Sequence, residues 1–158
     1  MSTVQIEIRD GVGTLRLAGP RGNAMSGDLI EDLSSAIRTV AGESSVRVVL
    51  LASAHPKLFC PGLDLVALSD YTRAEMGGYM LSFATVLTDL FALKKPVVAA
   101  VQGWAVGAGL EWMLDADVVV AASDARFKLP EASLGVFVTG GFTVTLAASA
   151  GLARAKAL

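Results

Sequence analysis

The chain has 158 residues, of which 53% are hydrophobic and 18% are charged, and its formal net charge at pH 7 is −2. This length is enough for one domain with a sizeable core, so we expect a single domain over residues 1–158 and exclude a disordered chain. The slight negative charge excludes a surface built mainly to bind nucleic acid.

Cysteine and histidine are scarce: Cys60 and His55 are the single examples of each. No disulfide can form within the chain, which favours a reducing compartment, and we expect a cytoplasmic protein. A dedicated zinc or iron site needs more such ligands, so no metal is expected. The N-terminal segment lacks the apolar stretch of a signal peptide.

The first elements follow from alternating apolar and polar residues. Segments 4–9 and 12–17 both alternate, and the Asp-Gly pair between them favours a tight turn, so we expect a β-hairpin. The following Gly-Pro-Arg-Gly-Asn, residues 19–23, predicts a loop.

Helices and buried strands are then expected in alternation, which predicts an α/β fold. Apolar spacing predicts a helix from the N-cap Ser26 to about Val40, and the loop with Pro56 and Pro61 leads to a helical region that ends near Leu93. Short apolar runs predict strands buried on both faces at 46–51, 96–101 and 118–121.

The segment from Ala132 to Ala153 carries no charged residue and is long enough to span a bilayer. Polar residues and glycines around Thr139 interrupt it. We therefore expect a buried loop followed by an apolar helix at a subunit contact, and no membrane span.

Three segments are candidates for chemistry: 59–65, 103–111 and 127–135. The first two contain glycines that allow backbone N–H groups to point outward, and the second leads into a helix whose free N–H groups favour negative charge. Glu111 and Glu131 lie in apolar surroundings. Such acids usually reach solvent at an edge, but two beside small-residue turns favour a shared pocket.

A dinucleotide-binding motif is the obvious alternative for the second segment, because Gly107 and Gly109 follow a strand. The third glycine of that motif is required at position 112, where Trp112 stands. We therefore reject this alternative.

Together the three segments resemble the crotonase (enoyl-CoA hydratase/isomerase) family. The family has a Phe-small-x-Gly-x-Asp-aliphatic motif, a Lys-Pro strand with a Gly-rich turn ending in Glu, and an Ala-x-Phe-x-x-Pro-Glu-x-x-Leu-Gly motif. This sequence matches them at 59–65, 95–111 and 125–135, and Asn23-Ala24 resembles the family's early loop. The resemblance covers essentially the whole chain, and it implies a spiral of repeated ββα units.

The resemblance implies an oxyanion hole made of two backbone N–H groups, at Leu63 and Ala108. Many members have Gly where Ala108 stands, but alanine keeps the amide. Such donors would stabilise an enolate-like transition state by about 3–4 kcal/mol each.

The resemblance also implies catalytic roles for Glu111 and Glu131, which match both glutamates of the family's hydratases. Water addition to a conjugated double bond needs one group to accept a proton and another to give one. Both acids together favour hydration of a 2-enoyl-CoA. An enoyl-CoA isomerase, or another acyl-CoA enzyme of the same fold, is the alternative.

Acyl-CoA thioester is thus the implied partner, and no separate cofactor is implied. The family's CoA channel matches Gly62, Asp64, Leu65 and Val66, and Lys57 is placed either to meet a CoA phosphate or to lie in solvent.

The sequence does not favour a thiol nucleophile, and at one position it departs from the family pattern. We expect Cys60 to pack in the interior and His55 to lie in a surface loop, rather than to form a nucleophilic pair. Trp112 stands where smaller aliphatic residues are common, which implies a reshaped acyl pocket.

Family members continue beyond position 158 with helices that complete the pocket and build a trimer or hexamer. The resemblance therefore implies a homo-oligomer, but also a shortened chain without the C-terminal helical region. A truncated subunit that binds or assembles without turnover is the third alternative.

Overall fold

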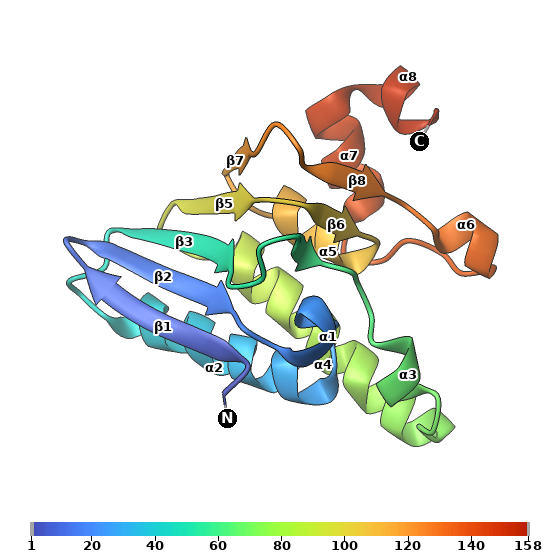
Figure 1. Cartoon of the computed structure of the whole chain (residues 1–158), viewed down its shortest axis with the longest axis horizontal. Helices are drawn as coiled ribbons and strands as arrows, with labels where there is room; N and C mark the ends of the chain where they lie inside the picture. Colours follow the sequence, from blue (N-terminus) through green and yellow to red (C-terminus); the bar gives the residue numbers. More distant parts are fainter. Residues whose placement is uncertain (1, 158) are drawn as a thin grey trace.

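The computed structural model describes residues 2–157, whose strands form two sheets (Figure 1). The larger sheet has the order β1-β2-β3-β5-β7, with β1 (Val4–Arg9), β2 (Val12–Leu17), β3 (Val48–Ser53), β5 (Val97–Val101) and β7 (Val118–Ala121). The smaller has the order β4-β6-β8, with β4 (Leu58–Cys60), β6 (Trp104–Val106) and β8 (Arg126–Lys128). The β1–β2 pair is antiparallel and the other pairings are parallel.

Helices connect the strands in a repeating pattern. They are α1 (Pro20–Asn23), α2 (Gly27–Gly42), α3 (Leu65–Leu68), α4 (Arg73–Phe91), α5 (Ala108–Leu114), α6 (Glu131–Leu134), α7 (Phe142–Ala150) and α8 (Leu152–Ala155). From β3 onward, each strand of the larger sheet is followed by a strand of the smaller sheet and then by helix. This order confirms the expected spiral of ββα units.

The core lies between the larger sheet and the pair α2 and α4 (Figure 1). Leu15 pairs with Leu51, which pairs with Ala99, and all three side chains are fully buried. α2 begins where the Ser26 hydroxyl accepts a hydrogen bond from Leu29 N, as predicted, and its apolar stripe is buried on this core.

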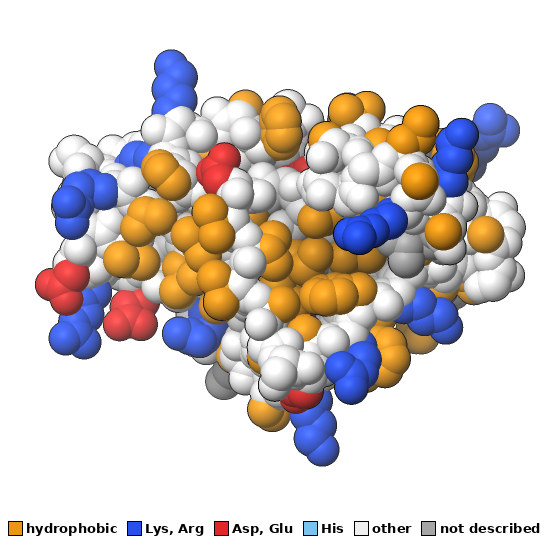
Figure 2. Space-filling model, turned by 90° about the horizontal axis from the view of Figure 1, so that it is seen from above, with side chains coloured by type: hydrophobic (Ala, Val, Ile, Leu, Met, Phe, Trp, Pro, Cys, Tyr) orange, Lys and Arg blue, Asp and Glu red, His pale blue; other side chains and the backbone are white. Residues whose placement is uncertain are grey.

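Within residues 2–157, no helix covers the opposite face of the larger sheet. Its outward side chains are mostly charged or polar on β1 and β2, as at Glu7 and Arg16, but apolar on β5 and β7. Val118 is 52% exposed and Val120 is 59% exposed. Seen from above, hydrophobic side chains gather over the sheet, whereas charged side chains lie mainly around the margin (Figure 2).

Most sequence-based elements are confirmed, including the hairpin and the side-by-side placement of β3, β5 and β7. β3 begins two residues later than predicted, because Arg47 N and Val48 N both donate to Gly11 O. The predicted loop at 19–23 contains the helical turn α1, in which Arg21 and Gly22 have positive φ angles.

Two predictions of burial were wrong. β7 was expected to be buried on both faces, but it is an edge strand, and most of its residues are exposed in the described part of the chain. The uncharged segment forms the helix α7, as predicted. The loop that precedes α7 is largely exposed, however, and within α7 the buried residue is Phe142. No helix within residues 2–157 combines the length and apolarity needed to cross a bilayer.

Candidate active site

The first turn of the site follows β4 and is held by the backbone of Met25. Met25 N donates to Gly62 O (2.9 Å), and Asp64 N donates to Met25 O (3.2 Å). Peptide groups alternate in direction along an extended segment, so the intervening Leu63 N–H points away from Met25. Gly62 has a φ of +92°, which other residues rarely adopt, and this conformation makes the turn possible.

The second turn joins β6 to α5 at Gly107, which has a φ of 52° and a ψ of −126°. Gly107 N donates to Lys128 O (2.9 Å), and Gly107 O accepts from Leu110 N and Glu111 N. Ala108 N is the first amide of the helix and has no acceptor within its own helix.

The two turns are in contact. A Cβ atom placed on Gly62 would lie 2.8 Å from Val106 O and 3.5 Å from Ala108 N. The amide of Leu63 follows directly on Gly62. The fold therefore brings together the two segments that the sequence analysis singled out, although they are separated by α3, α4 and β5.

Glu111 lies in the first turn of α5 and is 2% exposed, so it is no edge residue. Its carboxylate accepts hydrogen bonds from Thr139 N (3.0 Å) and from Thr139 Oγ1 (3.2 Å). Burial raises the pKa of Glu111, the two Thr139 hydrogen bonds act in the opposite direction, and the nearby charge of Glu131 adds to the rise. Thr139 was singled out in the sequence only as an interruption of the uncharged segment.

Glu131 is the first residue of α6 and lies against the second turn. A Cβ atom on Gly107 would come within 2.7 Å of Glu131 Oε1. The other oxygen, Oε2, is buried and has no hydrogen-bond partner among the described residues. The two carboxylates therefore flank the segment from Gly107 to Glu111, and one of them has an oxygen free for a ligand.

A cavity of about 310 Å³ adjoins Glu131. Its lining is mostly apolar and includes Leu129, Val138, Phe142 and Leu146. A larger hollow of about 460 Å³ lies between α2 and α4. None of its lining residues belongs to the two turns, and neither Glu111 nor Glu131 lines it.

Asp64 has a supporting role in the structure. It is 2% exposed, caps α3 by accepting from Ala67 N (3.0 Å), and forms an ion pair with Arg21, whose Nε lies 2.9 Å from Oδ2. Burial alone would raise the pKa of Asp64, but hydrogen bonds from Arg21 and Ala67 hold it below its usual value. Arg21 was not predicted, because a contact between loops so distant in sequence leaves no local pattern.

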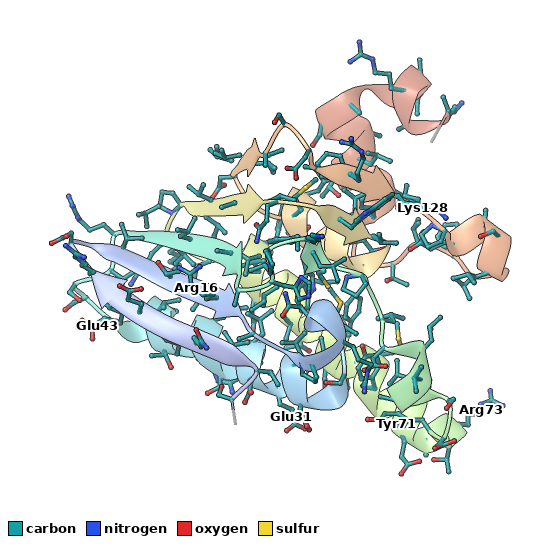
Figure 3. The ribbon with its side chains drawn as sticks, in the orientation of Figure 1. Arg16, Glu31, Glu43, Tyr71, Arg73 and Lys128 are labelled. Carbon is teal, nitrogen blue, oxygen red and sulfur yellow. The ribbon has the colours of Figure 1, made fainter. Side chains whose placement is uncertain are left out.

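The other predicted binding residues lie at the surface. Leu65 is 59% exposed and Val66 73% exposed on α3, and Lys57 is exposed in the loop before β4. Figure 3 labels Lys128 at the end of β8 and Tyr71 between α3 and α4.

Cys60 is buried in the core, as predicted, and its Sγ donates to Asn23 O (3.1 Å). Burial raises the pKa of this thiol to about 12, so it stays protonated and is a poor nucleophile. His55 is half-buried in the loop after β3. Within residues 2–157, no three His, Cys, Asp or Glu side chains are grouped closely enough to hold a metal ion.

Comparison with known families decides the assignment. The family model for enoyl-CoA hydratase/isomerase matches residues 7–158, which include both turns and both glutamates. The chain belongs to the enoyl-CoA hydratase/isomerase family. The crotonase resemblance in its motifs is thereby confirmed.

Relatives of this family member include enzymes named as hydratases. The mitochondrial methylglutaconyl-CoA hydratase of Homo sapiens is 35% identical over 136 residues, which are 86% of this chain and 40% of that protein. The short-chain-enoyl-CoA hydratase of Clostridium acetobutylicum is 31% identical over 100% of this chain and 61% of that protein. The chain thus spans 40% to 61% of the length of these two relatives.

A solved structure supports the fold of this family member as well. The crystal structure of enoyl-CoA hydratase from Bacillus anthracis superposes with a TM-score of 0.93 at 30% sequence identity. The superposition covers 99% of this chain and 61% of that one.

Proposed function

We propose that this chain carries the acyl-CoA site of an enoyl-CoA hydratase, which adds water to a 2-enoyl-CoA thioester. The observation that carries the proposal is the pair of carboxylates around the second turn. Glu111 is buried and held by Thr139, and Glu131 has a buried oxygen without a partner. Hydration requires a base and an acid. Two carboxyls on a shared site supply both, because the ionised one can act as the base and the protonated one as the acid.

In the proposed mechanism the thioester oxygen accepts hydrogen bonds from Leu63 N and Ala108 N. Neither amide has a partner among the turn and loop hydrogen bonds of the described residues, and the two turns touch at Gly62. Negative charge develops on this oxygen as the enolate forms, and each fixed donor would lower the barrier by about 3–4 kcal/mol.

The two glutamates would hold the attacking water. Its oxygen forms the bond to the β-carbon while one proton passes to the ionised carboxylate. The π electrons move toward the thioester oxygen, and the α-carbon then takes a proton from the protonated carboxyl. One water is consumed, and the same single proton is left on the glutamate pair at the end.

Further groups around the site suit the two ends of such a substrate. The apolar cavity beside Glu131 suits the acyl group, because burial of a hydrocarbon chain is favourable. The Arg21 side chain is 51% exposed and held in place by Asp64, so it can meet a CoA phosphate. Lys57 can add a second cation, and Gly62, Leu65 and Val66 would form the wall of the channel.

The direct test is incubation of the protein with crotonyl-CoA while the loss of enoyl absorbance is followed. Loss of absorbance with formation of 3-hydroxybutyryl-CoA supports hydration. Binding of the thioester without any loss supports a subunit that does not turn over. Conversion of 3-enoyl-CoA to 2-enoyl-CoA without hydration supports the isomerase.

A further inference from the structure

Asp115, directly after α5, is a second buried acid that the proposed mechanism does not use. It follows the last residue of the helix and is 8% exposed. Its Oδ2 atom is buried and has no hydrogen-bond partner in the described part of the chain. A carboxyl group in such a position is costly to ionise, because an unpaired charge is removed from water.

Asp115 lies one helical turn after Glu111, and its backbone N–H donates to Glu111 O (3.2 Å). Residues four apart on a helix share one face, so the two carboxyls are neighbours. The C-terminal end of a helix carries partial negative charge, which disfavours a carboxylate there.

Among the described residues, no Lys, Arg or His nitrogen lies within 4.0 Å of the Asp115 carboxyl oxygens. β4, β6 and α7 carry no Lys, Arg, His, Asp or Glu, and the titratable group of β4, the Cys60 thiol, remains neutral. α4 contacts α5 where Phe83 stacks on Trp112. The charged residues of α4 are Arg73, Glu75 and Asp89, and the Tyr79 hydroxyl of α4 stays protonated. The next acid, Asp117, accepts a hydrogen bond from Val97 N.

We propose that Asp115 is a positioning residue for Glu111: near neutral pH the two carboxyls share a single proton, which Asp115 holds while Glu111 is ionised. The role in catalysis rests on the proposed function, but the sharing of the proton does not. Burial, and then the charge of Glu111, raise the pKa of Asp115 to about 7, in agreement with this order of ionisation. Glu111 is thereby kept as a base, with a neutral neighbour that adds no second charge beside the forming enolate.

The proton is located by carbon-13 NMR of the labelled carboxyl groups, followed from about pH 4 to pH 9. The Asp115 signal should titrate near pH 7 in the parent chain and at lower pH in Glu111→Gln, because the repelling charge is gone. Asp115→Asn should remove this titration, and Asp124→Asn, an exposed loop control, should leave it unchanged. Ionisation of Asp115 already complete at about pH 5, or an unchanged midpoint in Glu111→Gln, overturns the proposal.

The link to chemistry is tested by the pH profile of kcat with crotonyl-CoA. The parent rate should decline as Asp115 ionises near pH 7, and Asp115→Asn should lose this part of the decline. An identical decline in both proteins overturns the positioning role. A parent chain that is inactive at every pH refutes the proposed hydratase instead, and the NMR titration then decides the proton sharing by itself.

Discussion

At the scale of single residues, the site depends on two glutamates with different surroundings. Glu111 is enclosed and hydrogen-bonded, whereas Glu131 keeps one oxygen unpaired. We expect Glu111→Gln and Glu131→Gln each to lower the hydration rate by about 10²–10⁴, because each removes a proton-transfer group. Affinity for the CoA ester, measured by calorimetry, should change little. If either variant of an active protein hydrates crotonyl-CoA at the parental rate, the two-carboxylate mechanism is wrong.

Gly107 holds the geometry of both glutamates. Its backbone conformation is nearly restricted to glycine, and an added Cβ would lie 2.7 Å from Glu131 Oε1. We expect Gly107→Ala to lower the free energy of unfolding by about 1–3 kcal/mol and to displace Glu131. The matched control is Gly77→Ala, at an exposed position of α4. A Cβ atom there meets no atom within 4 Å, so this substitution should raise stability by about 0.5–1 kcal/mol. Denaturant titrations of both variants check this, and equal effects would contradict it.

The residues named in advance are those with a local signature: a glycine that permits a turn, or an acid in an apolar segment. Gly62, Glu111 and Glu131 belong to this class. Thr139, Arg21 and Asp115 could not be assigned a role, because each acts through a partner brought close only by folding. Asp64 shows the same limit, since its place in the motif is visible in the sequence but its ion pair is not.

At the scale of elements, α4 owes its start to a capping box. The Thr72 hydroxyl accepts from Glu75 N, and the Glu75 carboxylate accepts from Thr72 N. We expect Thr72→Ala to lower the free energy of unfolding by about 1 kcal/mol. Thr85→Ala is the control, because Thr85 is exposed within the same helix and its hydroxyl only donates back to Leu81 O. Thermal unfolding that shows the same loss in both variants would argue against a capping contribution.

Element types were predictable because periodicity and capping residues are local. The hairpin, the Ser26 cap and the parallel strands β3, β5 and β7 were all correct. The predicted burial of β7 was wrong because an apolar run shows only that a strand can be covered. Whether a second layer covers it depends on the rest of the fold, which a run of four residues does not encode.

At the scale of the whole molecule, the uncovered face of the larger sheet has two halves. On β1 and β2 the outward side chains include Glu7, Arg9 and Arg16, which suit contact with water (Figure 3 labels Arg16). On β5 and β7 the register aligns apolar side chains, with Val98 beside Val118. An exposed apolar patch rimmed by charge is typical of a surface for protein association.

The predicted homo-oligomer can therefore be tested on this face. We expect the chain to self-associate through the apolar half, and Val120→Lys to shift it toward monomer, because a desolvated ammonium is costly in such an interface. Gln5→Lys is the matched control: it adds the same charge to the polar half of the same face, on exposed β1. Sedimentation velocity over a range of protein concentrations gives the distribution of species for the parent and both variants. A parent chain that stays monomeric throughout, or a Val120→Lys variant that associates as the parent does, would exclude this face as the interface. Loss of association in Gln5→Lys alone would instead place the interface on the polar half.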